Sequence, residues 1–118
     1  MEWKKALKLG QELVLATSSK NGKPRNIFVI SLGLVNNKLL IGACQMKTSL
    51  QNIKNNNKIS IAVKNKNNYY RIDGSVKIYT SGKYFAMAKK ISRDIPPKHA
   101  LVVNIKEAFD LDKIKKLY

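Results

Sequence analysis

The residues best suited to chemistry lie in one short segment, in which Gly42 and Ala43 precede Lys47, Thr48 and Ser49. The pattern predicts a strand that ends near residue 43 and a helix that begins near residue 47. At such a helix start, free backbone N–H groups and the helix dipole attract an anion, and Lys47 neutralises it. The two hydroxyl groups can donate hydrogen bonds to its oxygens. The segment is typical of a phosphate site, and its structural alternative is an ordinary helix cap made by Thr48 or Ser49.

Other reactive side chains are few. Cys44 is the single cysteine and His99 the single histidine, so an internal disulfide and a protein-built zinc site are excluded. We expect Cys44 to be a small packed residue and His99 to lie in a loop beside two prolines, residues 96–97. No nucleophilic triad is recognisable, so the catalytic residues stay unidentified and no metal ligand is assigned. Any catalysis is expected to depend on a cofactor.

The charge of the chain is strongly positive. Lys and Arg number 23 against 7 Asp and Glu, which gives a formal net charge of +16. Such a charge attracts nucleic acid, anionic lipid and small anions. The basic residues are lysines except for Arg25, Arg71 and Arg93, whereas base and phosphate recognition favours the guanidinium group. A bias toward Lys, Asn and Ile is also what an A+T-rich genome produces. Non-enzymatic binding of nucleic acid or another polyanion by a β-barrel is therefore kept as an alternative function.

The length of 118 residues fits one domain, and no internal repeat or linker divides it. No stretch is apolar for the roughly 18 residues that a membrane span needs, and the first residues lack the apolar run of a signal peptide. We expect a single domain over residues 1–118, located in the cytoplasm.

The elements that position this segment follow from the spacing of apolar residues. Period-two alternation and turn residues such as Asn21–Gly22 predict strands, and the spacing i, i+4, i+7 predicts helices. The expected strands are 12–18, 24–35, 38–43, 59–64, 70–78 and 101–109; the expected helices are 2–10, 47–55 and 84–91. The tail, 111–118, is predicted to be a short helix or an extended arm.

The fold class that these elements predict is mainly β with a few short helices. Six antiparallel strands of this length close most easily into a small split β-barrel, because closure removes the strand edges that invite aggregation. Aromatic residues such as Trp3, Phe28 and Tyr70 are expected in its core.

Four segments in order resemble a known family: "LVLATSSKNGKPRN", "MKTSLQNI", "KISIAVKNKNNYYRIDGSVKI" and "HALVVNIKEAFDL". They are similar to successive parts of the pyridoxamine 5'-phosphate oxidase-like FMN-binding split barrels, and most similar to the short FMN-binding members. The likeness covers about residues 5–112. The chain lacks the Arg- and His-bearing C-terminal segment of the oxidases themselves, so oxidation of pyridoxamine phosphate is not expected.

The resemblance implies FMN as cofactor, held at the interface of a homodimer. It implies a redox flavoprotein, either an NAD(P)H-dependent flavin reductase or an electron carrier that works with a redox partner protein. The same fold with a deazaflavin or haem is the other alternative. The implied flavin-binding residues are Lys47 and Thr48 at the phosphate, Asn26, Ile27 and Phe28 near the ring, and Gly42 and Ala43 beside it. Ser49 is added as a phosphate-binding residue from the helix-start pattern described above. Asn52 is expected to brace the helix turn.

Overall fold

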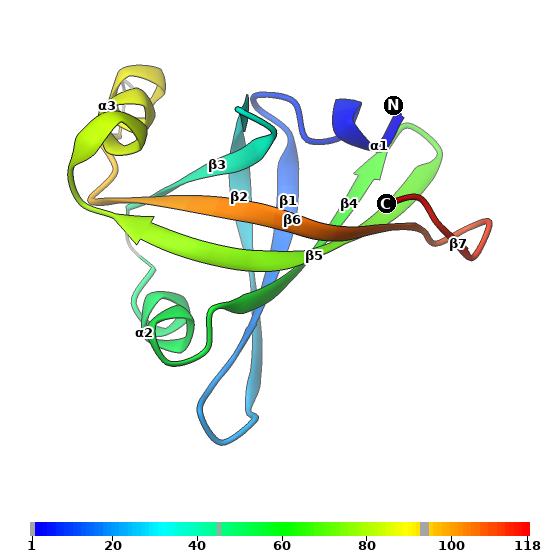
Figure 1. Cartoon of the computed structure of the whole chain (residues 1–118), viewed down its shortest axis with the longest axis horizontal. Helices are drawn as coiled ribbons and strands as arrows, with labels where there is room; N and C mark the ends of the chain where they lie inside the picture. Colours follow the sequence, from blue (N-terminus) through cyan, green and yellow to red (C-terminus); the bar gives the residue numbers. More distant parts are fainter. Residues whose placement is uncertain (1, 45, 93–94) are drawn as a thin grey trace.

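The framework of the computed structural model is a closed antiparallel β-barrel (Figure 1). Residues 2–44, 46–92 and 95–118 are described. The six long strands are β1 (Glu12–Ser18), β2 (Pro24–Val35), β3 (Lys38–Ala43), β4 (Lys58–Asn65), β5 (Asn68–Tyr79) and β6 (His99–Asp110). Their order in the sheet is β3-β2-β1-β4-β5-β6, and β3 also pairs with β6. The predicted mainly-β, six-stranded antiparallel barrel is confirmed.

The pairing of β3 with β6 closes the barrel. It runs in register from Leu39 opposite Val103 to Ala43 opposite His99. His99 is therefore the first residue of a strand, and its expected position in a loop was wrong. The strand begins two residues before residue 101, where the apolar pattern placed its start.

Three short helices accompany the barrel: α1 (Glu2–Lys5), α2 (Thr48–Asn55) and α3 (Gly82–Ile91). In Figure 1, α2 and α3 lie at one end of the barrel, and α1 lies at the other end near the C-terminus. The second and third helices match their predictions. The first is shorter than the predicted 2–10, because the chain turns where the Leu7 N–H donates to the Lys4 carbonyl, and Gly10 adopts a φ of 91°. None of the helices in the described ranges has the length and apolar composition needed to cross a bilayer.

The tail is an extended arm, which is one of the two predicted conformations. Its two-residue strand β7 (Lys115–Lys116) pairs with the end of β6. The Leu117 N–H donates to the Ala108 carbonyl at 2.7 Å. The Tyr118 ring lies 5.6 Å from the Trp3 ring, centroid to centroid. These contacts fix the arm against α1.

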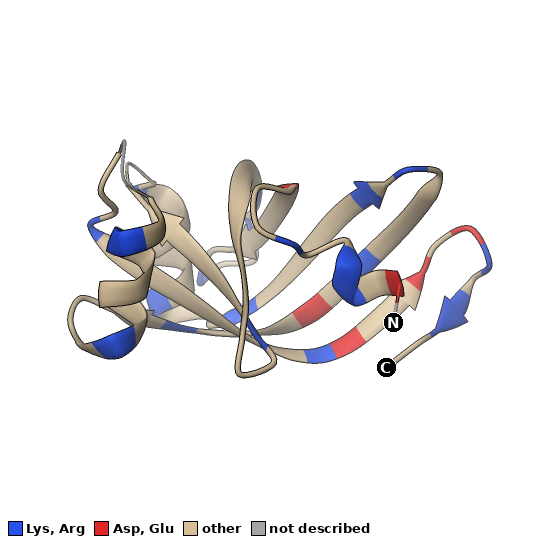
Figure 2. Cartoon of the chain, turned by 90° about the horizontal axis from the view of Figure 1, so that it is seen from above, with Lys and Arg blue, Asp and Glu red and all other residues tan. Residues whose placement is uncertain are grey.

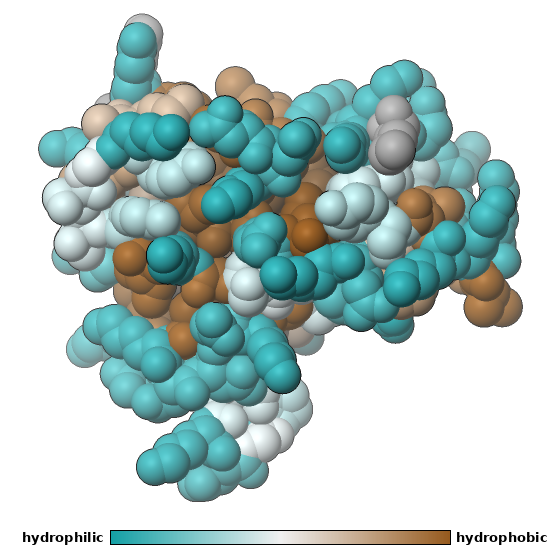
Figure 3. All heavy atoms as spheres, viewed as in Figure 1, coloured by the Kyte–Doolittle hydropathy of each residue, from teal (hydrophilic) through white to brown (hydrophobic). Residues whose placement is uncertain are grey.

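The core follows the alternation of the strands, because successive side chains point to opposite faces of a sheet. Most inward residues belong to one large cluster, and a smaller cluster lies under α3 and consists of Leu32, Leu40, Ala88, Ala100 and Val102. On the face shown in Figure 3, apolar atoms gather between α3 and α2, while hydrophilic atoms cover α2 itself.

The aromatic residues do not all lie in this core. Trp3 and Tyr70 are each 3% exposed, as predicted. Phe28 is 78% exposed, and the prediction that it is a core residue was wrong. Its neighbour Val29 is buried, so the pleat of β2 turns Phe28 outward.

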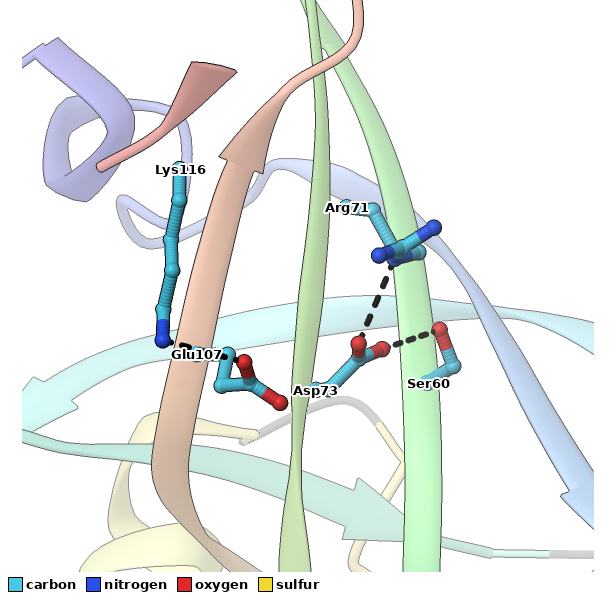
Figure 4. Close-up of polar contacts among 5 residues, drawn as sticks. All are labelled: Ser60, Arg71, Asp73, Glu107 and Lys116. Carbon is cyan, nitrogen blue, oxygen red and sulfur yellow. Dashed lines mark hydrogen bonds and ion pairs between the residues drawn. The ribbon is translucent and has the colours of Figure 1, made fainter. Parts of the chain in front are cut away.

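Polar contacts cross the outer face of β4, β5 and β6 (Figure 4). The Ser60 hydroxyl donates to Asp73 at 2.6 Å, and Arg71 Nε lies 3.2 Å from the other oxygen of that carboxylate. Lys116 Nζ lies 3.3 Å from a Glu107 oxygen and links β7 to β6. Because these groups are partly exposed, each ion pair stabilises the fold by less than about 1 kcal/mol.

A bulge interrupts the pairing of β5 with β6. Asp73 lies opposite Glu107 and Gly74 lies opposite Ile105, so Lys106 is the extra residue. A methyl group at Gly74 would collide with the Asn104 carbonyl oxygen. Glycine therefore permits the close approach of the two backbones.

Candidate functional site

A basic hollow lies between α2 and the start of β6. Its volume is about 430 Å³, and its lining consists of Cys44, Met46, Lys47, Leu50, Gln51, Lys54, Lys98 and His99. Three ammonium groups and an imidazole in one hollow attract an anionic ligand. We call this the basic hollow.

Helix α2 positions Lys47 and Lys54 through its amphipathic spacing. Ser49, Asn52 and Ile53 are buried on the face toward the barrel. The residues at 47, 50, 51 and 54 share the other face, which lines the basic hollow. Asn52 Nδ2 donates to the Thr17 hydroxyl at 3.1 Å, and this buried bond anchors α2 to β1.

The start of α2 offers backbone donors. Lys47 is the N-cap residue and makes no side-chain capping bond. The interpretation of Thr48 or Ser49 as the cap is therefore wrong, because the helix begins one residue earlier than a Thr48 cap requires and two residues earlier than a Ser49 cap requires. The first bond within the helix joins the Gln51 N–H to the Lys47 carbonyl at 3.1 Å, so the N–H groups of residues 48–50 have no intrahelical partner.

The opposite wall of the basic hollow comes from the junction of β3 and β6. The Lys98 N–H donates to the Ala43 carbonyl at 2.9 Å, which continues the pairing of Ala43 with His99. The next residue, Cys44, is partly exposed, and its thiol donates to the Ile95 carbonyl at 3.6 Å. Cys44 therefore belongs to the wall of the hollow, and the expected packed position was only partly correct.

An apolar hollow adjoins the basic one. Its volume is about 560 Å³, and its lining consists of Leu9, Ile27, Phe28, Val29, Ile30, Leu32, Gly42, Cys44, Met46, Ile91, Ser92 and Ile95. A methyl group at Gly42 would lie 3.3 Å from both Leu32 Cδ1 and Pro97 Cβ. Glycine therefore lets the segment around residue 97 pack closely on β3.

Cys44 and Met46 line both hollows. The two hollows are therefore neighbours along one surface, basic at one end and apolar at the other. Such a surface fits an elongated ligand that carries an anionic group at one end and a large apolar group at the other.

The charged residues of the described ranges are unevenly distributed. Among the described residues, the carboxylates lie toward α1, the middle of β5 and β6, and the C-terminal arm, while the end that carries α2 and α3 shows basic residues (Figure 2). The lysines of that end include Lys83, Lys89 and Lys90 on α3. Basic residues also lie at the other end (Figure 2), but among the described residues no carboxylate lines either hollow to offset the lysines there.

All eight predicted site residues are described. Lys47 lines the basic hollow, and Ile27, Phe28 and Gly42 line the apolar one. The other four lie outside both linings: Asn26 and Thr48 are exposed, and Ala43 and Ser49 are 1% and 2% exposed. The structure thus brings together one predicted phosphate residue and three predicted ring residues.

Sequence reasoning missed several lining residues, above all Lys54, Lys98 and His99. Lys54 lies seven positions after Lys47 and so on the same helix face, a signal that the sequence carries. The other two come from a segment about 50 residues away, and the pairing of β3 with β6 places them there.

Comparison with known proteins places this arrangement in a family. Residues 2–112 match the family described as pyridoxamine 5'-phosphate oxidase. The uncharacterized protein MJ0282 of Methanocaldococcus jannaschii is 30% identical over 112 residues, which cover 87% of this chain and 75% of that protein.

Solved structures of the same fold are similar over nearly the whole chain. HupZ of Group A Streptococcus has a TM-score of 0.87 at 24% identity, covering 100% of this chain and 98% of that one. An FMN-binding protein of Syntrophomonas wolfei has a TM-score of 0.76 at 16% identity, covering 92% and 80%. An F420 reductase has a TM-score of 0.71 at 18% identity, covering 89% and 94%. With the family match over residues 2–112, the chain belongs to the pyridoxamine 5'-phosphate oxidase family.

Proposed function

We propose that residues 1–118 form a single FMN-binding domain that works as a redox flavoprotein. The observation that carries the proposal is the adjoining pair of hollows, one basic and one apolar, which share Cys44 and Met46. FMN has the matching chemistry, a phosphate joined through a ribityl chain to a flat aromatic ring system. Membership of the family supports the same cofactor.

The residues of the basic hollow fit a phosphate. Lys47 supplies a charge-assisted donor at the start of α2, and the N–H groups of residues 48–50 supply uncharged donors beside it. Lys54 and Lys98 add positive charge from two further elements. We propose Lys47 and the Thr48 turn as the phosphate ligands, with the buried Ser49 supporting the turn from the barrel side.

The apolar hollow fits the ring system. Ile27, Phe28 and Gly42 line it, and Asn26 lies next to the first two on β2. Ala43 supports Gly42 from the core. Bound FMN would supply the transfer of hydride or of single electrons, as in an NAD(P)H-dependent flavin reductase or an electron carrier. The protein residues orient the ring and shield one of its faces from water.

Titration of the purified protein with FMN and with riboflavin tests this proposal. We expect the fluorescence of FMN to be quenched on binding. FMN should bind at least about tenfold more tightly than riboflavin, because riboflavin lacks the phosphate and therefore its charge-assisted hydrogen bonds. Equal affinities for FMN and riboflavin would show that the basic hollow does not bind the phosphate. A protein that binds neither compound would overturn the proposed function.

The rim of the apolar hollow supports a homodimer with the flavin at its interface. Leu9, Phe28, Ile30 and Ile95 line this hollow and are 60%, 78%, 47% and 65% exposed. Exposed apolar side chains gathered at one site mark an interaction surface. A second copy of the chain would cover them and would shield the other face of the ring.

We expect Phe28→Ser to shift the protein from dimer toward monomer in light scattering, because it removes the most exposed apolar side chain of this rim. Added salt should favour the dimer of the unchanged chain, since it screens repulsion between two chains of +16. Ile114→Ser is the matched control, because Ile114 is 91% exposed outside both hollows. A monomer at every salt concentration that still binds FMN would contradict the interface site.

Two other ligands are alternatives at the same surface. A deazaflavin has a comparable ring and anionic tail, and the fold is shared with an F420 reductase. A deazaflavin that binds more tightly than FMN would favour this alternative. The net charge of +16 supports polyanion binding as the second alternative. The affinity for nucleic acid would then be independent of the nucleotide sequence and would fall steeply with salt.

A further inference from the structure

The only histidine of the chain lies in the wall of the basic hollow. His99 is half-buried at the start of β6, and its side chain lines the hollow together with Lys47, Lys54 and Lys98. The pairing with Ala43 holds its backbone in place. The two nitrogens of its ring have different surroundings.

The Nδ1 atom of His99 is buried and has no hydrogen-bond partner. The Nε2 atom is not among the buried atoms that lack a partner, and no hydrogen bond joins it to another described residue. Because the side chain lines the hollow, Nε2 is the nitrogen that is accessible from it.

This asymmetry selects one tautomer of the neutral ring. A neutral imidazole carries its proton on one nitrogen, and the other nitrogen is an acceptor. A buried N–H group without an acceptor is rarer in proteins than an under-satisfied acceptor. The proton therefore belongs on Nε2, which makes that atom a hydrogen-bond donor at the basic hollow.

We propose that His99 binds the anionic group of the ligand through this Nε2–H donor. The inference rests on the proposed function, in which the anionic group is the FMN phosphate. An N–H donor adds direction to a site whose lysine side chains supply mainly charge. His99 would thus fix the position of the phosphate opposite Lys47.

Nitrogen-15 NMR at pH 8 tests the tautomer directly, because a chain with one histidine gives one pair of imidazole signals. We expect the signals of a neutral ring protonated at Nε2. Addition of FMN, and separately of inorganic phosphate, should shift the Nε2 signal more than the Nδ1 signal. Protonation at Nδ1, or no response to either compound, would overturn the inference.

Two substitutions test the donor itself. The Gln amide nitrogen reaches the position of Nε2, whereas the shorter Asn amide lies near that of Nδ1. We expect His99→Asn to weaken FMN binding about tenfold and His99→Gln to stay within about threefold of the unchanged chain. Neither should change riboflavin binding, because riboflavin has no phosphate. Equal losses in both variants, or a parallel loss for riboflavin, would contradict a donor role.

The two proposals fail in different ways. If the unchanged chain binds neither FMN nor riboflavin, the proposed function fails. The role of His99 toward an anion is then decided by the phosphate titration, in which a selective Nε2 shift supports it and an unchanged spectrum overturns it. If FMN binds normally and the Nε2 signal does not respond, the role of His99 fails alone.

Discussion

Replacement of Lys47 by alanine should weaken FMN binding about ten- to a hundredfold in fluorescence-quenching titrations. The reason is the loss of a charge-assisted hydrogen bond, which contributes roughly 1.5–3 kcal/mol. Lys47 is the N-cap residue of α2 and lines the basic hollow, so its ammonium group lies where the phosphate is proposed to bind.

Three controls separate this effect from a general loss of charge or of structure. Lys20→Ala removes the same charge from an exposed hairpin residue that lines neither hollow, and it should leave FMN affinity within about twofold, because exposed charges are screened. Thr48→Ala should cost less than Lys47→Ala, since the hydroxyl is neutral and the backbone N–H groups remain. Riboflavin should respond little to any of the three. Unchanged FMN affinity in Lys47→Ala, or an equal loss for riboflavin, would show that Lys47 is not the phosphate ligand.

Gly74→Ala should be the most destabilising of the small substitutions in the barrel. The added methyl group would collide with the Asn104 carbonyl oxygen, which belongs to the strand backbone of β6 and cannot rotate away. Overpacking of this kind costs about 1–3 kcal/mol and occasionally more, and we expect the upper end of that range. Chemical denaturation, followed by circular dichroism, measures the change in the free energy of unfolding.

Gly42→Ala provides the comparison for this prediction. Its methyl group would lie 3.3 Å from Leu32 Cδ1 and Pro97 Cβ, which are side-chain atoms that can shift by a few tenths of an ångström. We expect a smaller loss, below about 1.5 kcal/mol. If Gly74→Ala is no more destabilising than Gly42→Ala, the tight backbone approach at the β5–β6 bulge is not a requirement of the fold.

The sequence predicted the barrel well because β1, β4 and β5 alternate between inward and outward residues. Ile59, Ile61 and Val63 are all buried, with exposed or half-buried residues between them. The first helix was overestimated because Ala6 and Leu7 really are buried, but in a turn rather than in a helix. The spacing of apolar residues indicates which residues are buried. Over a single turn of chain it does not distinguish a helix from a non-helical turn.

The part of the site that consists of residues close together in the sequence was predictable. Lys47 and the start of α2 follow from residues close in sequence, whereas Lys98 and His99 enter the basic hollow through a strand pairing that no local pattern encodes. For Phe28, by contrast, the local pattern was misleading. Its apolar character suggested the core, and its exposure on β2 became clear from the register with β1, where it lies opposite Val14.

The pairing of β3 with β6 also determines when the barrel can close during synthesis of the protein. Leu39 of β3 pairs with Val103 of β6, which the ribosome adds 64 residues later. At about 5–20 residues per second, that delay is about 3–13 seconds. During this time one edge of β3 has no partner, and such edges recruit other chains. Nascent chains should therefore depend on chaperones until the last long strand emerges.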